Sequence, residues 1–310
     1  MSKIKVIVNP NAGRGYGAQL SPRIAECLVE RKVDFDLVHT RGPGHAIELA
    51  QQATEDGYDT IIAVGGDGTS HEVVNGLMAE ANGAPVGTLG WVPAGSGNDF
   101  AAMNGTPTDL DAACDLVAQG STRVVDVGHI TIDGTIKRYF DNTVGIGFDG
   151  LVCMETYKHR NLRGMALYLP VVLKTIFLTL RPVRATITLD GRTLEPSNLM
   201  MVVVANGPRE GGSFLVAPNA LCNDGLFDVI LVEQMSRLRM LSMVPRFMKG
   251  SHLSDRHISE TRASHMIIRS EDPLYVHVDG EVFTDEAHEI ELVTFPAALR
   301  VISPLGNGSC

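Results

Sequence analysis

The segment Thr60–Glu72 constrains the fold of this chain more than any other part of the sequence. An apolar run, Thr60–Val64, leads directly into the octet Gly65-Gly-Asp-Gly-Thr-Ser-His-Glu72. Glycine lets the backbone approach a bulky anion, while the N–H groups of the loop and of a following helix supply positive potential. This order of strand, glycine turn and polar helix start predicts a phosphate-binding loop. An ordinary turn is the alternative, because glycine-rich loops are common without a phosphate.

Asp67 is the unexpected residue of this loop. A carboxylate beside phosphates repels them unless a cation bridges the two groups. Its presence therefore predicts Mg²⁺ at the loop, or else a role for Asp67 with a polarised substrate. On both interpretations Asp67 is a candidate catalytic residue.

Strand and helix signals alternate at close spacing through the first third of the chain. The expected strands are 4–8, 35–40, 60–64 and 85–92, and the expected helices are 18–31 and 44–56. Such an order predicts a parallel sheet covered by helices, in which ligands bind at the carboxyl ends of the strands. Polar loops follow all four strands at that edge, at 9–15, Thr40, 65–72 and 93–99.

From about residue 123 the pattern changes to short strands separated by turns, which predicts an antiparallel β domain. The expected strands are 123–132, 137–144, 185–189, 199–205, 227–232, 266–268 and 274–278. One stretch within it, 151–182, has a helical pattern. At 310 residues the chain is long for one core, so we predict two domains, 1–125 and 126–296. No long linker separates them, and the active site is therefore expected in the cleft between the two domains.

Composition narrows the function classes. Lys and Arg number 26 against 36 Asp and Glu, and this net charge of −10 argues against a nucleic-acid surface over the whole protein. The five cysteines are scattered without a Cys-x-x-Cys pair, so we expect neither a disulfide framework nor a zinc site. The N-terminus runs straight into a strand pattern and no clean apolar stretch reaches about 20 residues, so we expect a cytoplasmic protein without a signal peptide or spanning helix.

Six motifs follow one another along the chain: Val8–Gly13, Gly65–Gly76, Pro93–Ala101, Asn142–Asp149, Asn223–Asp228 and Val278–Glu281. In this order they resemble the motifs of the soluble bacterial diacylglycerol kinase and lipid kinase family, over essentially the whole chain. Gly-Gly-Asp-Gly alone is similar to a loop that NAD kinases and phosphofructokinases share, but the later motifs are more selective. The resemblance implies an α/β domain like that of NAD kinases and phosphofructokinases, then a mainly antiparallel β-sandwich domain. It also implies that the closing segment 297–310 returns to the first domain.

The resemblance implies an ATP- and Mg²⁺-dependent lipid kinase that transfers the γ-phosphate to a lipid hydroxyl, with diacylglycerol as the favoured acceptor and phosphatidic acid as the product. Such an enzyme mainly places the γ-phosphate in line with the hydroxyl and neutralises charge. The positions that match the family's ATP contacts are Asn9, Pro10, Asn11, Ala12, Gly13, Thr40, Gly66, Asp67, Gly68, Thr69, Ser70, His71, Glu72 and Ser96.

Several polar residues near these loops also have simpler interpretations. Without the resemblance, Thr40 would be taken as a hydroxyl that caps a helix over 43–56. Asn98 and Asp99 are as well suited to cap the helix that follows them as to a direct role in the site. His71 is predicted to lie on the surface of a helix rather than to act as a catalyst.

Glu281 matches the family's proton acceptor, which takes the proton from the attacking hydroxyl. A free carboxylate is a weak base for an alcohol, so burial or a neighbouring acid, Asp279 or Asp67, would have to raise its pKa. The surrounding sequence also fits a β-turn with Asp279-Gly280 at its apex, whatever Glu281 does.

The segment Leu221–Leu226 resembles the family's structural Mg²⁺ loop. The resemblance assigns the side chain of Asp224 and the carbonyl groups of Leu221 and Leu226 as ligands. A Mg²⁺ ion that keeps several waters and takes one carboxylate is usual in proteins. From spacing alone, an Asn-Asp-Gly hairpin turn is the better interpretation. Asp149 also falls on a family motif, but no role is assigned to it.

A basic segment, 234–257, contrasts with the acidic chain, because it holds five Arg or Lys residues and one Asp among apolar ones. The pattern fits a helix that docks on anionic lipid at the inner face of a membrane, and equally a helix that buries its apolar face on the β domain. The apolar run 165–180 could line an acyl-chain groove, but core packing is the preferred interpretation. The resemblance further suggests a homodimer, which nothing in the sequence itself specifies.

Other functions stay open at this point. A different acceptor, such as phosphatidylglycerol, an isoprenoid alcohol or a sphingoid base, would need no change of motif, whereas NAD is disfavoured by the full-length motif order. From another class, a nucleotide- or lipid-binding regulator could keep the fold without turnover. The joint presence of Asp67, Asp224 and Glu281 argues against such an inactive site.

Overall fold

The computed structural model describes residues 3–79, 86–158 and 165–305. Its first part is a parallel sheet whose strands pair in the order β2, β1, β3 and β4. These strands are β1 (Ile4–Val8), β2 (Phe35–His39), β3 (Thr60–Gly65) and β4 (Val86–Pro93). Every residue of β3 is buried, as expected of a parallel strand that helices cover on both faces.

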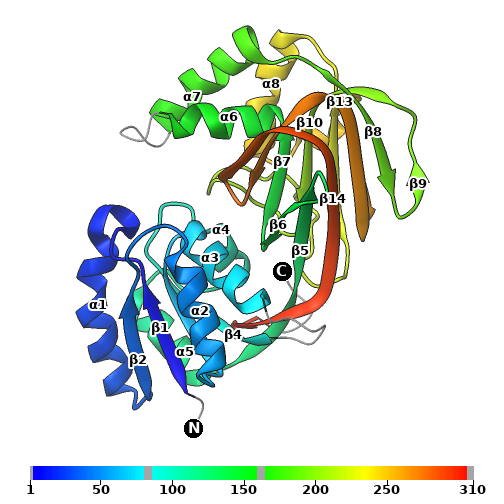
Figure 1. Ribbon diagram of the computed structural model, residues 1–310. Helices are drawn as coiled ribbons and strands as arrows, with labels where there is room; N and C mark the ends of the chain where they lie inside the picture. The colour runs from blue at the N-terminus through cyan, green and yellow to red at the C-terminus, as the bar shows by residue number, and fades with distance from the viewer. Residues whose placement is uncertain (1–2, 80–85, 159–164, 306–310) are drawn as a thin grey trace.

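Helices cover both faces of this sheet (Figure 1). On one face α1 (Ala12–Glu30) and α5 (Leu110–Gln119) enclose a core with β1 and β3. On the other face α2 (His45–Glu55) and α3 (Asp67–Met78) pack together with the short α4 (Asp99–Met103). The predicted α/β domain is confirmed.

Antiparallel strands form the second part of the molecule, which lies above the first in Figure 1. Their apolar side chains enclose a separate core, in which Phe140 stacks on Phe227. This arrangement confirms the predicted β-rich domain. The strands are β5 (Thr122–Ile132), β6 (Ile136–Phe140), β7 (Thr143–Gly147), β8 (Val183–Leu189), β9 (Arg192–Thr193), β10 (Ser197–Ala205), β11 (Phe227–Glu233), β12 (Ile258–Ala263), β13 (His265–Val278) and β14 (Glu281–Ile302).

A third buried cluster joins helices to β10 and β11 of this second sheet. The helical segments are α6 (Phe148–Tyr157), α7 (Met165–Lys174), the π-helical turn η1 (Thr175–Thr179) and α8 (Arg237–Met248), which the single 3₁₀ turn η2 (His252–Ser254) follows. The stretch predicted to be helical over 151–182 therefore divides into α6, α7 and η1, and its residues 159–164 lie outside the described residues.

The last strand, β14, joins the two parts. It pairs antiparallel with β13 and β5, and its end pairs in parallel with β4 through Leu299, Arg300 and Val301. In Figure 1 this strand curves from the upper sheet down to the lower one. The expected closing segment 297–310 contains the pairing with β4, although its residues 306–310 lie outside the described part of the chain.

Several strands differ from those expected. The expected strand 137–144 divides into β6 and β7, because the backbone N–H groups at Asp141 and Asn142 bond to the Asp279 carboxylate instead of continuing a ladder. The pieces expected at 266–268 and 274–278 form one strand, β13, with a register shift between them. The sequence pattern does not indicate β12 or most of β14, because their exposed polar positions interrupt the apolar alternation.

The basic segment 234–257 forms α8 and η2. The apolar side chains of Met240, Met243 and Phe247 are buried against the second sheet, while Arg239 and Arg246 both pair with Asp255, at 2.8 and 3.2 Å. This burial is the second of the two arrangements expected for the segment. No helix among the described residues is long and apolar enough to cross a membrane.

Candidate active site

A cleft of about 860 Å³ lies where the loops at the carboxyl ends of β1 to β4 meet two segments of the second sheet. Residues from four loops of the first domain line it: Asn9, Asn11, Ala12 and Gly13; Thr40, Gly42 and Pro43; Gly66–Thr69; and Gly95–Gly97. On the other side it is lined by the turn Asp279–Glu281 and by residues of the 210–213 loop. A cleft of this size can hold a nucleotide or another small ligand.

Three of the loops pack backbone against backbone, which requires glycine. A Cβ on Gly95 would lie 2.4 Å from Cα of Gly66, and a Cβ on Gly13 would lie 2.4 Å from the carbonyl oxygen of Ala94. Gly13 also has a φ of +56°, which side chains disfavour. The three loops therefore bring their backbones together beside the N-terminus of α3, and a helix N-terminus is a favourable environment for a phosphate.

Glu281, the first residue of β14, reaches this glycine loop from the opposite wall. A Cβ on Gly68 would lie 2.9 Å from Oε1 of Glu281, so the end of the Glu281 side chain lies directly beside the backbone of this loop. Oε2 of Glu281 lies 3.8 Å from Nη1 of Arg138. The Glu281 side chain is 45% exposed, so the protein alone does not provide the burial that a stronger base would need.

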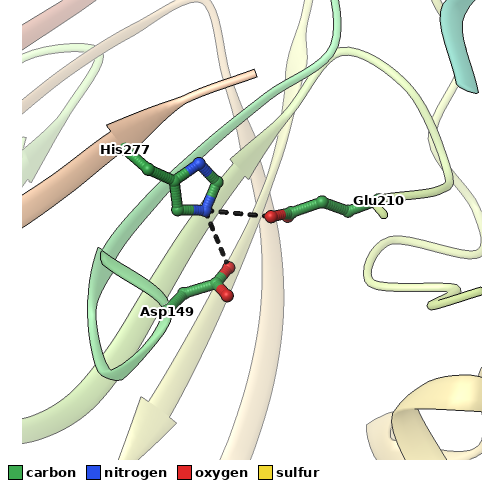
Figure 2. Close-up of side chains that lie close together, drawn as sticks. All are labelled: Asp149, Glu210 and His277. Atoms are coloured by element: carbon green, nitrogen blue, oxygen red, sulfur yellow. Dashed lines mark ion pairs between the residues drawn. The ribbon is translucent and has the colours of Figure 1, made fainter. Parts of the chain in front are cut away.

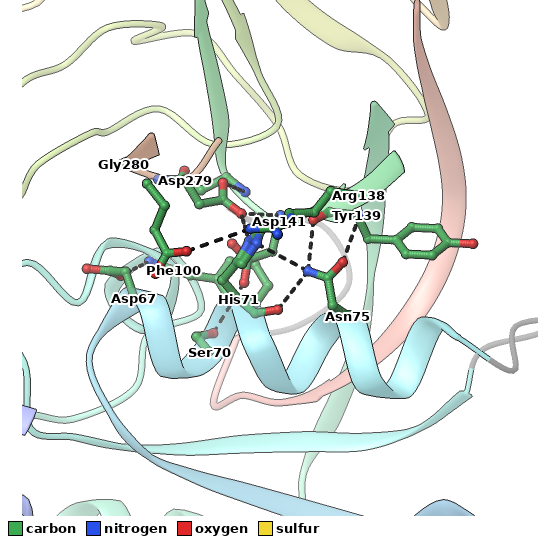
Figure 3. Close-up of polar contacts among 12 residues, drawn as sticks. Asp67, Ser70, His71, Asn75, Phe100, Arg138, Tyr139, Asp141, Asp279 and Gly280 are labelled. Carbon is green, nitrogen blue, oxygen red and sulfur yellow. Dashed lines mark hydrogen bonds and ion pairs between the residues drawn. The ribbon is translucent and has the colours of Figure 1, made fainter. Parts of the chain in front are cut away.

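Asp279 fixes the turn that carries Glu281 (Figure 3). Its carboxylate accepts hydrogen bonds from the backbone N–H groups of Asp141, Asn142 and Thr143 at 3.1, 3.0 and 2.9 Å, and contacts Nδ1 of His71 at 2.7 Å. Burial alone would raise the pKa of Asp279, but the hydrogen bonds from His71 and the backbone lower it overall. A buried, ionised carboxylate therefore holds β6, β7 and α3 together behind the turn.

His71 and Ser70 lie beneath the cleft rather than in it. His71 is 2% exposed, and its pairing with Asp279 makes the prediction of a helix-surface position wrong. The Ser70 hydroxyl donates to Asp141 at 3.2 Å and accepts from Nε1 of Trp91 at 2.8 Å. Burial, reinforced by the negative charge of Asp279, raises the pKa of Asp141 well above its usual range, which favours the protonated form of this carboxyl group beside the ionised one.

Asp67 joins the β3 loop to the loop after β4. Its carboxylate accepts from the backbone N–H groups of Asn98 at 2.7 Å and Phe100 at 3.4 Å, at the start of α4. Burial raises the pKa of Asp67. The Asn98 side chain bonds to Gly95 and does not cap α4, while Asp99 accepts from the N–H of Gly212 at 2.9 Å across the cleft.

The cleft brings together most of the residues that the sequence singled out. Pro10, Ser70 and His71 do not line it. The predicted residues that do are Asn9, Asn11, Ala12, Gly13, Thr40, Gly66, Asp67, Gly68, Thr69, Glu72, Ser96 and Glu281.

The structure rules out the helix-cap interpretation of Thr40 and gives Glu72 a local hydrogen-bonding role that the sequence did not indicate. Thr40 does not cap the helix after it: α2 begins after Gly44, without a side-chain cap. The Glu72 carboxylate instead accepts from the N–H groups of Gly44 and Ala46 at 2.8 and 3.0 Å. Thr40 is buried in the cleft wall, so its hydroxyl remains a candidate contact for a ligand.

Asp141, Asn142 and Glu210 are among the cleft residues that were not expected from the sequence. Asn142 is the first residue of the recognised motif Asn142–Asp149, so the sequence could have indicated that it belongs to the site. Asp141 and Glu210 stand in no recognised motif, and only the paths of β6 and of the loop after β10 bring them to the cleft.

The predicted Mg²⁺ loop at Leu221–Leu226 lies away from the cleft lining. One carboxylate oxygen of Asp224 accepts from the N–H of Leu226 at 3.1 Å, and the other forms an ion pair with Arg262. A carboxylate already neutralised by a guanidinium is a poor ligand for a cation, so in this arrangement the loop does not fit Mg²⁺. The assignment of Leu221, Asp224 and Leu226 as ligands stays a prediction.

The cleft is acidic. Of the described residues that line it, none is Lys or Arg and seven are Asp or Glu, namely Asp67, Glu72, Asp99, Asp141, Glu210, Asp279 and Glu281. Backbone amides are the positive groups that the loops themselves offer. A polyphosphate in this cleft would therefore need a bound divalent cation to offset the carboxylates.

Comparison with known proteins shows which family has this sequence and architecture. Residues 3–130 match the family model of the diacylglycerol kinase catalytic domain, and residues 142–303 match that of the YegS C-terminal NAD kinase beta sandwich-like domain. A Mycobacterium tuberculosis protein named diacylglycerol kinase is 32% identical over 306 residues, 98% of this chain and 96% of that protein. The chain belongs to the diacylglycerol kinase catalytic-domain family. A Bacillus subtilis diacylglycerol kinase is 30% identical over 91% of this chain and 90% of that protein.

Solved structures agree with membership of the diacylglycerol kinase family. The crystal structure of a diacylglycerol kinase from Bacillus anthracis superposes with a TM-score of 0.77 at 26% identity, covering 97% of each chain. An NAD kinase from Archaeoglobus fulgidus in complex with ATP superposes with a TM-score of 0.53 at 14% identity, over 98% of this chain and 94% of that one, which shows a likeness of fold alone. The resemblance seen in the motifs is confirmed.

Proposed function

We propose that this chain is an ATP- and Mg²⁺-dependent lipid kinase that phosphorylates diacylglycerol. The contact between Gly68 in the glycine loop and Glu281 from β14 carries the proposal. This contact places the Glu281 carboxylate beside the backbone amides of the glycine loop, which would hold the phosphates. A base that faces a phosphate cradle is what transfer to a hydroxyl requires.

The glycine loops would hold the phosphates through backbone amides, and Asn9, Thr40 and Ser96 offer further polar contacts in the cleft wall. Mg²⁺ bound with the nucleotide would supply neutralising charge, and Asp67 is the residue that would hold it. The Asp67 carboxylate accepts backbone N–H groups at the start of α4, and its two oxygens offer about four acceptor positions in all, so one remains for a cation.

In the transfer step, Glu281 would accept the proton of the lipid hydroxyl as the oxygen attacks the γ-phosphate. Asp279 would keep the turn in place through its bonds to three backbone N–H groups, without touching the substrate itself. Because Glu281 is half-exposed, the acyl-glycerol would have to exclude water from this carboxylate on binding. The names of the relatives favour diacylglycerol over phosphatidylglycerol, an isoprenoid alcohol or a sphingoid base.

An assay with radiolabelled ATP against a panel of these lipids tests the proposal. We expect labelled phosphatidic acid from diacylglycerol with Mg²⁺, and none after the metal is removed with EDTA. Asp67→Asn should lose most of this activity while it keeps a cooperative unfolding transition. Labelling of another lipid in preference would change the acceptor, and no labelled lipid from any acceptor would instead favour a nucleotide-binding regulator.

We further propose that η1 and α8, which contact each other, face the membrane that holds the acceptor. The side chains of Leu178 and Leu238 are 77% and 73% exposed there. Arg237 and Lys249 are also exposed, whereas Arg239 and Arg246 are paired with Asp255. Exposed apolar side chains beside exposed basic ones suit docking on anionic lipid.

Sedimentation with anionic vesicles tests this docking face. A variant with Arg237→Gln and Lys249→Gln is expected to bind about 30-fold more weakly, because each basic residue near the surface contributes about 1 kcal/mol. Arg184→Gln with Arg192→Gln is the matched control, since these two residues are exposed on β8 and β9 of the same domain. Equal binding by both double variants would refute the docking face.

A further inference from the structure

Asp149, Glu210 and His277 form a cluster that the phosphoryl transfer does not use (Figure 2). Nε2 of His277 lies 3.1 Å from a carboxylate oxygen of Asp149 and 2.9 Å from one of Glu210. The three side chains come from separate segments: the first turn of α6, the loop after β10, and β13. In Figure 2 they converge on one point from different directions.

The backbone around the cluster is built to hold this arrangement. A Cβ on Gly145 in β7 would lie 2.1 Å from Nε2 of His277 and 2.5 Å from Asp149, so the imidazole needs glycine beneath it. Gly147, with a φ of +82°, turns the chain from β7 into α6 and so presents Asp149. Glu210 is fixed by two backbone hydrogen bonds to Phe214, at 2.9 and 3.0 Å.

Polar atoms in this cluster are buried without hydrogen-bond partners. The His277 side chain is 1% exposed, yet neither carboxylate lies in a hydrogen-bonding direction from Nε2. The second oxygen of Glu210 is also buried without a partner. Two carboxylates that flank one imidazole nitrogen direct their negative charge and lone pairs at a shared point, where either a protonated imidazole ring or a bound metal ion would offset that charge.

We propose that Asp149, Glu210 and His277 bind a divalent transition-metal ion such as Mn²⁺. Ligand atoms about 2.1 Å from one ion and at right angles to each other are about 3 Å apart, which matches the two distances to Nε2. Two carboxylates and a neutral imidazole balance a charge of +2. The imidazole nitrogen favours a transition metal over Mg²⁺ or Ca²⁺, which prefer oxygen ligands alone.

The site faces the cleft but is separate from the metal expected with the nucleotide. Glu210 lines the cleft on the wall of the second sheet. The side chains of Asp149 and Glu210 remain 19% and 16% exposed, which leaves positions on the ion open to water or a substrate oxygen.

Binding of the ion also sets the tautomer of His277. When Nε2 binds the ion, the ring proton moves to Nδ1. This ends the long contact, 3.3 Å, that Nδ1 accepts from the N–H of Gly280, a bond near the weak limit.

Electron paramagnetic resonance of Mn²⁺ with the full chain, in the absence of nucleotide, tests the site. We expect one bound ion whose pulsed spectrum contains ¹⁴N modulation from the His277 ring. The modulation should disappear in His277→Gln, while Glu210→Gln and Asp149→Asn should each weaken Mn²⁺ binding at least tenfold. The two carboxylate variants carry the test if His277→Gln fails to fold, because their side chains are not part of the core.

Two controls separate this site from other acidic sites. Glu291→Gln breaks a similar imidazole–carboxylate contact, 2.9 Å between His265 and Glu291, that is exposed and lacks a second carboxylate, so it should leave Mn²⁺ binding unchanged. Asp224→Asn removes the carboxylate of the predicted Mg²⁺ loop and should preserve the ¹⁴N modulation. Absence of the modulation in the wild-type protein, or unchanged affinity in Glu210→Gln, would overturn the proposal.

Discussion

Replacing Glu281 with Gln is expected to lower the rate of phosphoryl transfer by a factor of about 10²–10⁴, which is the usual contribution of a positioned general base. The amide keeps the size of the side chain and its place beside Gly68, but it cannot accept the proton of the hydroxyl. Nucleotide affinity and stability should stay close to those of the wild-type protein, because Glu281 is half-exposed and its distance of 3.8 Å from Arg138 makes only a weak ion pair. Single-turnover kinetics with labelled ATP would measure the loss directly.

Glu289→Gln is the matched control for this experiment. Glu289 lies in the same strand, its side chain is also 45% exposed, and it pairs with Arg269 at 2.5 Å as Glu281 pairs with Arg138. It lies outside the cleft lining, so its replacement should leave turnover unchanged. Near-normal turnover in Glu281→Gln would remove this residue from the proton-acceptor role and leave the cleft without its proposed base.

Local sequence patterns predicted the first domain well, because each of its elements is encoded nearby. The strand, glycine loop and helix start around Asp67 are contiguous, so their order alone indicates a phosphate cradle. The second sheet was harder to predict. Its strands pair with partners far along the chain. In β14 the alternation of exposed polar and buried apolar positions is irregular, so it does not give a clear strand signal.

The errors at individual residues have the same origin. His71 follows a glycine loop on a polar helix start, and nothing local indicates that its partner is Asp279 on a distant turn. The break between β6 and β7 also depends on that carboxylate, which takes the backbone N–H groups of the turn. The ion pair of Asp224 with Arg262 in β12 likewise depends on the pairing of β11 with β12, whereas its assignment as a metal ligand came from the resemblance alone and stays a prediction.

The same reason explains why Asp149 received no role from its motif. Its neighbours Glu210 and His277 stand in different segments, and no spacing rule for metal ligands joins them. The sequence could place each residue at the end of a strand or the start of a helix. Only the antiparallel pairing of β7 with both β10 and β13 brings the three segments together.

Asp279→Ala is expected to destabilise the protein by about 3–5 kcal/mol, which is the usual effect of removing one partner from a buried ion pair. It would leave His71 and the backbone N–H groups of Asp141, Asn142 and Thr143 buried without their acceptor. Because the pKa of Asp279 is lowered in the folded state, its stabilisation is present above the pKa of the unfolded chain, about 4, and is lost as the pH falls below that value. Urea unfolding at neutral pH would measure the change.

Asp190→Ala is the control that isolates the contribution of burial. Asp190 also has a positive φ, precedes a glycine and accepts from two backbone N–H groups, at Ser264 and His265, but it is exposed. Its loss should cost only about 1 kcal/mol, the net value of ordinary hydrogen bonds. Equal losses of stability in the two variants would show that the buried His71–Asp279 pair contributes little beyond the hydrogen bonds of the turn.

Asp279→Asn tests whether Asp279 also holds Glu281 in place. This variant keeps one acceptor oxygen, and it should lower kcat more than it raises the KM for ATP, because the nucleotide loops lie on the opposite wall of the cleft.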